Sequence, residues 1–294
     1  MRILLLALLS MAQLSCKKVD PKPNGPLESQ PVKFSQLLET FRYAPTAKPI
    51  ISVHRGGKGI AHYPENCLET LKYINDSITA IFEIDIAKTK DNVLVLLHDN
   101  TLERTTTGQG KLTDYTFAQL QELYLVDDYG NTTDFKIPLF KTVLEWARDN
   151  NVVLTLDIKK SVAVEDVVQL VEDTKAENVS VIITYDLQQA EHANAIAPGL
   201  LLSVSARNDQ ELEWLLRSGI PTENMVAFTG TRVSPDRLYQ KIHSHGIKTM
   251  LGTLGNLDNS AAARGDSLYN VWIAKGIDII ATDRPFAVAK RILH

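Results

Sequence analysis

Acidic residues recur at the ends of two otherwise apolar segments. Glu83 and Asp85 lie two residues apart within residues 81–86. If this segment is a β-strand, both side chains point to the same face. Asp157 ends a later apolar segment, with Lys159 two residues further on. Carboxylates brought together away from water repel each other, and a hard divalent cation with oxygen ligands relieves that repulsion. The three acids therefore predict a metal site.

Two histidines also follow apolar segments directly. His54 comes after residues 50–53, and His98 comes after residues 93–97. Because the imidazole pKa lies near neutral pH, such a pair suits general acid and general base catalysis. Arg55 offers a forked donor for phosphate oxygens, and Lys159 could touch an anionic substrate beside Asp157. Together these residue types predict metal-assisted chemistry on a phosphate ester.

The remaining histidines carry no such pattern. We expect them to be packed or solvent-facing side chains: His62, His192, His243, His245 and His294. His243 and His245 look like a metal pair, but residues two apart on a helix do not face each other.

Eight short apolar segments, separated by helical patterns, must position these groups. Near-continuous apolar runs of four to six residues suit strands of a parallel sheet that is buried on both faces. The segments are residues 50–53, 81–84, 152–156, 179–184, 200–204, 225–228, 247–251 and 277–281. Eight β/α alternations in one chain predict a (β/α)8 TIM barrel, in which the loops after the strands build the active site.

One further apolar segment, residues 93–97, breaks this rhythm. It follows the second predicted strand too closely for a parallel crossover, which needs about a dozen residues. We therefore predict a hairpin over residues 82–98, and an insertion from about residue 87 to residue 136 that covers the mouth of the barrel.

Composition limits the partners of the chain. Its 294 residues suit one barrel of about 250 residues. A formal net charge of −4 gives no reason to expect nucleic acid as a partner, because phosphate backbones favour a basic face. It also argues against broad electrostatic adhesion to anionic lipid. We expect a small-molecule phosphodiester as the substrate.

The N-terminal segment has its own character. Residues 1–16 combine a basic start, an apolar run too short to span a bilayer, and a small residue before Cys16. This predicts a lipoprotein-type signal peptide with Cys16 as the lipidation site, although Gln13 stands where such boxes usually carry an aliphatic residue. The alternative is an ordinary signal peptide with an unrelated cysteine. Residues 17–45 are predicted to be a tether and residues 46–294 the barrel. The protein is then exported to a bacterial cell envelope and touches the membrane through its anchor only.

Several short motifs occur in a fixed order. They are His54-Arg55-Gly56, Pro64-Glu65-Asn66, Glu83-Ile84-Asp85, His98-Asp99, and residues 101–106 with Gly108-Gln109-Gly110. In this respect the chain resembles the glycerophosphodiester phosphodiesterases over residues 50–160. A weaker match follows at residues 277–285, which end in Thr282-Asp283-Arg284-Pro285.

The resemblance implies a β/α barrel that hydrolyses glycerophosphodiesters to glycerol 3-phosphate and an alcohol. It implies that His54 and His98 are the acid/base pair and that Arg55 contacts phosphate. Glu83 and Asp85 would hold Mg²⁺ or Ca²⁺, and Glu65 would lie at the edge of the site as a ligand or an acceptor behind the ligands.

Two positions depart from the family pattern. Asp157 stands where the family usually has glutamate, so this ligand is one methylene shorter. The related sphingomyelinase D-like phospholipases use aspartate there, and we expect metal binding to survive. The family often has a tryptophan in the strand near Gly252, and this chain has none there. The departure bears on the substrate more than on the chemistry.

Two other functions remain open. A phospholipase of the phosphatidylinositol-specific or sphingomyelinase D-like kind could use the same groups, and an apolar cleft beside the metal would favour it. The other is a surface lipoprotein that binds a phosphorylated ligand without turning it over.

Overall fold

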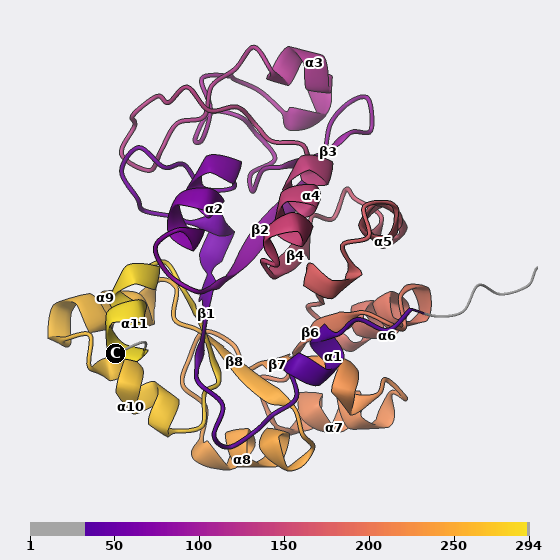
Figure 1. Cartoon of the computed structure of the whole chain (residues 1–294), viewed down its shortest axis with the longest axis vertical. Helices are drawn as coiled ribbons and strands as arrows, with labels where there is room; N and C mark the ends of the chain where they lie inside the picture. The colour runs from indigo at the N-terminus through magenta and orange to yellow at the C-terminus, as the bar shows by residue number, and fades with distance from the viewer. Residues whose placement is uncertain (1–32, 293–294) are drawn as a thin grey trace, which may run out of the picture. The chain divides into compact units, whose positions relative to one another are not determined.

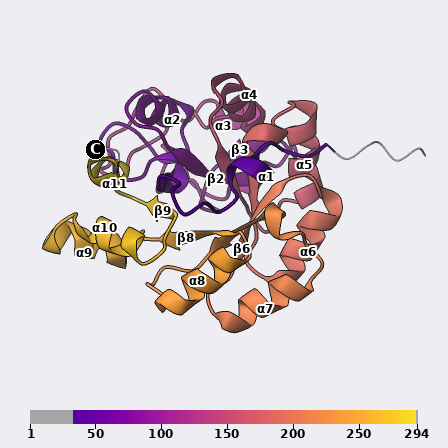
Figure 2. The same cartoon turned by 60° about the horizontal axis from the view of Figure 1, so that its bottom comes forward.

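A closed ring of parallel strands organises the chain. The computed structural model describes residues 33–292, and within them nine strands form one sheet. Strand β1 (Ile50–Val53) pairs in parallel with both β2 (Ile81–Lys88) and β9 (Ile279–Thr282), which closes eight strands into a barrel. The predicted (β/α)8 TIM barrel is confirmed, and Figures 1 and 2 show its helices arranged around the strands.

The eight predicted segments all coincide with barrel strands. The other parallel strands are β4 (Leu154–Ile158), β5 (Ser180–Ile183), β6 (Leu201–Ser205), β7 (Met225–Phe228) and β8 (Lys248–Gly252). The helices that follow the strands are α2 (Leu68–Asn75), α4 (Phe140–Asn150), α5 (Val164–Asp173), α6 (Leu187–Ile196), α7 (Asp209–Arg217), α8 (Asp236–Ser244), α9 (Asn256–Arg264), α10 (Leu268–Ala274) and α11 (Pro285–Ile292).

Alternation along each strand separates the core into two parts. On β2, Phe82 and Ile84 pack outward in the large core that the helices share. Ile81, Glu83 and Asp85 belong to the inner face. Ile81 lies in the apolar part of the barrel interior, at the end where the strands begin. Glu83 and Asp85 line a hollow at the opposite end, where the strands finish. The interior is therefore apolar where the strands begin and polar where they end.

A short N-terminal helix closes the apolar end. Helix α1 (Leu37–Thr40) places Leu37 and Phe41 in one buried cluster with residues at the starts of several strands, and Figure 2 shows α1 over that end of the barrel. The backbone N–H of Tyr43 donates to Gly246 O at 2.9 Å. The predicted tether over residues 17–45 is therefore wrong for its last part. The open end of the barrel leaves apolar side chains that need a cover.

The insertion after β2 forms a lobe of its own, uppermost in Figure 1 with α3 (Phe117–Leu120). It begins with β3 (Leu94–Leu96), which is antiparallel to the end of β2 as the hairpin prediction required. A separate small core holds the lobe together and contains the buried Cys67. Burial and the nearby Glu69 carboxylate raise the pKa of this thiol to about 12.

Cys16 and the predicted signal peptide lie outside the described residues. No helix between residues 33 and 292 is long and apolar enough to cross a bilayer.

Candidate active site

A hollow of about 310 Å³ opens at the carboxyl ends of the barrel strands. One part of its wall, which we call the charged arc, carries His54, Glu83, Asp85, His98 and Asp157 from β1, β2, the end of the hairpin, and β4. The opposite part, the neutral arc, carries small polar and apolar side chains from β6, β7, β8 and the loops that follow: Ser203, Ser205, Phe228, Thr231, Met250 and Leu254.

Three carboxylates converge in the charged arc. Asp85 and Asp157 are direct neighbours in the parallel register of β2 and β4, and one carboxylate oxygen from each of Glu83, Asp85 and Asp157 lies within 4.8 Å of the others. The Lys159 ammonium contacts Asp85 Oδ1 at 2.5 Å and Asp157 Oδ2 at 2.9 Å. When all three carboxylates are ionised, the cluster and the Lys159 ammonium together carry two negative charges. Oxygen ligands with that net charge fit a divalent cation such as Mg²⁺ or Ca²⁺.

The close approach of these charged groups shifts their pKa values. Burial, together with the neighbouring Asp85, raises the pKa of Glu83 well above its usual range. Burial also opposes ionisation of Asp157, but the charge of the Lys159 ammonium and the hydrogen bonds from Lys159 and Tyr185 together outweigh it and lower the pKa of Asp157. In turn the pKa of Lys159 is raised, because Asp85 and Asp157 outweigh the cost of burying the ammonium. A cation at this cluster would favour the ionised form of Glu83.

Neutral hydrogen-bond donors hold two of the carboxylates in place. Asn66 Nδ2 donates to Asp85 Oδ2 at 2.6 Å, while the backbone N–H of Asp85 donates to Asn66 Oδ1 at 2.9 Å. The hydroxyl of Tyr185, which follows β5, donates to Asp157 Oδ1 at 2.8 Å. Sequence reasoning gave neither residue a role. Asn66 belongs to the Pro64-Glu65-Asn66 motif and could have been found, whereas Tyr185 stands in no motif.

Each predicted catalytic histidine is tied to its own aspartate. His54 Nδ1 lies 2.7 Å from Asp283 Oδ1, and His98 Nδ1 lies 2.6 Å from Asp99 Oδ1. Burial opposes ionisation of Asp283, but the hydrogen bond with His54 and the nearby positive charges together outweigh it and lower the pKa of Asp283. The hydrogen bond from Arg104 is the main cause that lowers the pKa of Asp99. An ionised carboxylate can only accept, so each Nδ1 carries the proton and each Nε2 is left for chemistry.

Arg55 lies between the two histidines. Its Nη2 is 2.6 Å from His98 Nε2, and its backbone N–H donates to Glu83 Oε2 at 2.7 Å. Since a guanidinium can only donate, His98 Nε2 accepts and the ring is neutral. Arg55 has a left-handed φ of 52°, a conformation that costs a non-glycine residue about 1 kcal/mol or more and occurs at functional sites.

The glycines after Arg55 serve packing rather than close approach to a ligand. A Cβ at Gly56 would lie 2.5 Å from Leu71 Cδ1, and one at Gly57 would lie 2.6 Å from Ile74 Cδ1, both on α2. Both glycines also have positive φ. They allow the turn after β1 to pack closely against α2.

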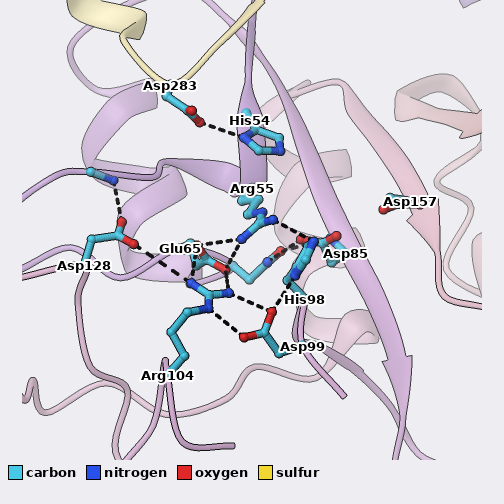
Figure 3. Close-up of polar contacts among 12 residues, drawn as sticks. His54, Arg55, Glu65, Asp85, His98, Asp99, Arg104, Asp128, Asp157 and Asp283 are labelled. Atoms are coloured by element: carbon cyan, nitrogen blue, oxygen red, sulfur yellow. Dashed lines mark hydrogen bonds and ion pairs between the residues drawn. The ribbon is translucent and has the colours of Figure 1, made fainter. Parts of the chain in front are cut away.

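Arg104 links Asp99, which bonds His98, to Glu65, which bonds Arg55 (Figure 3). It donates to both oxygens of Asp99, with distances of 2.6 and 3.0 Å, and to both oxygens of Glu65, with distances of 3.0 and 2.7 Å. Glu65 also accepts from Arg55 Nη1 at 3.1 Å. Glu65 is buried, but the hydrogen bond from Arg104 and the charges of Arg55 and Arg104 together outweigh that burial and lower the pKa of Glu65. Glu65 is thus the shared acceptor of two arginines, Arg55 and Arg104.

The other described histidines lie apart from this hollow. His243 bonds Asp278 at 2.8 Å and stacks on Tyr43, and His192 pairs with Glu165 at 3.3 Å. Both are accounted for by packing or surface pairing, as expected from the sequence. His294 lies outside the described residues.

On the neutral arc, Phe228 and Gly252 fit together. A Cβ on Gly252 would lie 3.2 Å from the Phe228 ring and 3.0 Å from Thr231 Cγ2. The Phe228 ring of the neighbouring strand therefore lies against Gly252, where no side chain projects. An aromatic surface is present in this wall, supplied by β7.

Known proteins share both the sequence pattern and the fold. The model of the glycerophosphoryl diester phosphodiesterase family matches residues 54–285. Glycerophosphodiester phosphodiesterase 1 of Homo sapiens is 32% identical over 133 residues, which cover 44% of this chain and 39% of that protein. The chain thus aligns with less than half of the length of this relative. Glycerophosphodiester phosphodiesterase of Caldanaerobacter subterraneus is 24% identical over 81% of this chain and 95% of its own.

Solved structures extend the comparison. A glycerophosphoryl diester phosphodiesterase from Parabacteroides distasonis superposes with a TM-score of 0.83 at 35% identity, covering 89% of this chain and 93% of that one. A phosphodiesterase from Oleispira antarctica, solved with the product sn-glycerol-3-phosphate, shares the fold with a TM-score of 0.66 at 19% identity and covers 84% and 98%. The family match begins directly after β1 and spans the other barrel strands and every group of the charged arc, so this chain belongs to the glycerophosphoryl diester phosphodiesterase family.

Proposed function

We propose that the protein hydrolyses glycerophosphodiesters to glycerol 3-phosphate and an alcohol, with a divalent cation and two histidines. The observation that carries the proposal is the acidic cluster of Glu83, Asp85 and Asp157 in one hollow with His54 and His98. The names of the relatives, and the glycerol 3-phosphate bound to the Oleispira antarctica enzyme, support the substrate class.

Glu83, Asp85 and Asp157 would hold the cation, which we propose is Mg²⁺ or Ca²⁺. When bound, such an ion polarises a phosphoryl oxygen and neutralises charge that develops on it. Asn66 and Tyr185 fix the directions of two of these carboxylates from behind. Aspartate at position 157 is supported from both sides, by Tyr185 and Lys159.

Arg55 and Lys159 would bind the phosphate. Arg55 Nε is buried and has no hydrogen-bond partner among residues 33–292, so it keeps a donor for a ligand oxygen. Lys159 keeps its positive charge because of Asp85 and Asp157, and it would stabilise charge on the phosphoryl oxygens.

The two histidines would move the protons. His98 is neutral with Nε2 unprotonated, which favours it as the base that takes a proton from the nucleophile, either water or a neighbouring substrate hydroxyl. To act as the acid, His54 would carry a second proton on Nε2, which lies 4.0 Å from Glu83 Oε2, and would give that proton to the leaving alkoxide while Asp283 holds Nδ1. Arg55 has to leave His98 Nε2 and turn to the phosphate for the base to act.

Release of glycerol 3-phosphate from glycerophosphocholine tests this proposal. The purified protein is assayed with Mg²⁺, with Ca²⁺ and with EDTA. We expect release with at least one ion and none in EDTA. Metal and substrate binding without product would instead favour a lipoprotein that only binds its ligand.

The place of the protein in the cell is a separate proposal, which rests on the sequence of residues 1–16. We propose that Cys16 carries lipid and holds the enzyme at a bacterial envelope membrane. Labelled palmitate should enter the wild-type protein but not Cys16→Ser in the native host. Equal labelling of both would contradict lipidation at this residue.

A further inference from the structure

A second hollow of about 410 Å³ lies beside the catalytic one, between the start of α6 and the face of α7. Its apolar lining comes from Tyr185, Leu187, Trp214 and Leu215. We call it the Tyr185–Trp214 groove. Tyr185 is 53% exposed and Trp214 is 48% exposed, so two half-exposed aromatic side chains line one hollow. Exposed aromatic side chains around a hollow mark a binding surface.

The groove is continuous with the catalytic hollow. Tyr185 and Ser205 line both of them. The same Tyr185 whose hydroxyl holds Asp157 thus presents its ring to the groove. A molecule whose phosphate lies at the acidic cluster and whose organic part passes Tyr185 and Ser205 would enter the groove directly.

The charged side chains of the groove already have partners. Asp186 Oδ1 accepts from the Gln189 backbone N–H at 2.9 Å. Arg207 and Glu211 are joined by side-chain hydrogen bonds of 2.7 and 3.0 Å, and Glu211 also accepts from the Arg207 backbone N–H at 2.8 Å. Glu211 therefore has little capacity left for a cationic head group, and Arg207 repels one. The aromatic and leucine side chains favour apolar surface instead.

We propose that the Tyr185–Trp214 groove binds an aliphatic chain carried by one of the two organic groups of the phosphodiester. This inference rests on the proposed phosphodiester site, and it adds a substrate class: phosphodiesters that bear an alkyl or acyl chain. It also bears on the phospholipase alternative, for which an apolar cleft beside the metal was the distinguishing feature.

Binding of alkyl phosphates, measured by titration calorimetry with Mg²⁺ or Ca²⁺ present, tests this inference without any turnover. Ethyl phosphate and n-octyl phosphate are compared below the micellar concentration. Each buried methylene contributes about fourfold in affinity, so contact with only part of the chain should make octyl phosphate at least tenfold tighter in the wild type. Trp214→Ser should remove most of this preference, and Trp214→Phe should keep it.

Phe34→Ser is the matched control, because Phe34 is 70% exposed and lines neither hollow. It should retain the full preference for octyl phosphate. Equal affinity for the two phosphates in the wild type, or an unchanged preference in Trp214→Ser, would overturn the inference. Failure of the hydrolysis proposal would look different, because the chain-length preference in binding would persist while no glycerol 3-phosphate is released.

Discussion

The two arcs of the catalytic hollow are built by opposite means. In the charged arc, every ionisable group contacts another, and the contacts reach from β1 and β2 to the insertion and the last barrel strand. The neutral arc consists of hydroxyl and apolar side chains that fit by shape, as Phe228 does over Gly252. Directional contacts fix charged groups for chemistry, whereas shape and apolar area decide which organic group fits. We therefore expect changes in the charged arc to lower kcat, and changes in the neutral arc to alter KM and substrate preference.

The largest effect should follow the loss of a histidine. His98→Ala should lower kcat for glycerophosphocholine by about 10²- to 10⁴-fold, the range for removal of a general acid or base. The exposed His245 provides the control, and His245→Ala should be near normal. Near-normal turnover by His98→Ala would remove His98 from the mechanism and weaken the contrast between the arcs.

A smaller effect is expected from Arg104, which touches no group of the acidic cluster. Arg104→Gln should lower kcat by about 10- to 100-fold, because Asp99 and Glu65 lose the cation that orients them toward His98 and Arg55.

The matched control for Arg104 is Arg148→Gln. The two side chains are similarly exposed, 39% for Arg104 and 38% for Arg148, and both pair with an aspartate. A merely structural role of Arg104 would lower the unfolding temperature without moving the pH profile of kcat. We expect the profile to move, because the charges around His98 change.

The neutral arc should respond more weakly and in a different parameter. Phe228→Leu should change kcat/KM for glycerophosphocholine by less than about tenfold, mostly through KM, since it removes part of an apolar contact. Steady-state kinetics separate the two constants. A loss confined to kcat and as large as that of His98→Ala would contradict the division between the arcs.

The smallest effect on turnover is expected at Asp127, which fastens the insertion to the loop after β1. It accepts from the backbone N–H groups of His62, Tyr129 and Asn131. Burial opposes its ionisation, but these bonds and the Asn131 side chain lower its pKa from 3.8 to about 2. Ionised Asp127 therefore stabilises the fold above about pH 4, and this contribution is lost as the pH falls toward 2.

Asp127→Asn should accordingly lower the unfolding temperature at pH 7 by roughly 2–4 °C, the scale of about 1 kcal/mol. Turnover should be nearly unchanged. The difference from wild type should shrink when calorimetry is repeated below pH 4. A difference that grows on acidification would contradict the assigned ionisation.

Much of this architecture could be predicted from the sequence for a definite reason. Barrel strands are buried on both faces, so they appear in the sequence as short apolar runs. Residues two apart on a strand point to the same face, which places Glu83 with Asp85 and Asp157 with Lys159. The parallel register then brings β2 and β4 together, as the pairing of Asp85 with Asp157 shows. Helix α1 was missed because its few apolar residues acquire a partner only once the barrel has closed.

The partners of the functional groups were harder to predict. His54 and Asp283 are 229 positions apart, and nothing local in the sequence connects them. Asp99 and Arg104 stood within recognised motifs, but only the folded insertion shows that Asp99 bonds His98 and that Arg104 bonds Glu65. The Tyr185–Trp214 groove had no sequence signal, because single aromatic residues after strands and on helices are common.

The measurement that tests the account most directly is equilibrium binding of Mg²⁺ and Ca²⁺ to the wild-type protein and to Asp85→Asn, with glycerol 3-phosphate release followed in the same samples. We predict about one ion per wild-type chain, at least tenfold weaker binding in Asp85→Asn, and release that rises with the occupied fraction. Unchanged binding in Asp85→Asn, or full release in EDTA, would contradict the claim that the charged arc acts through a metal held by Glu83, Asp85 and Asp157.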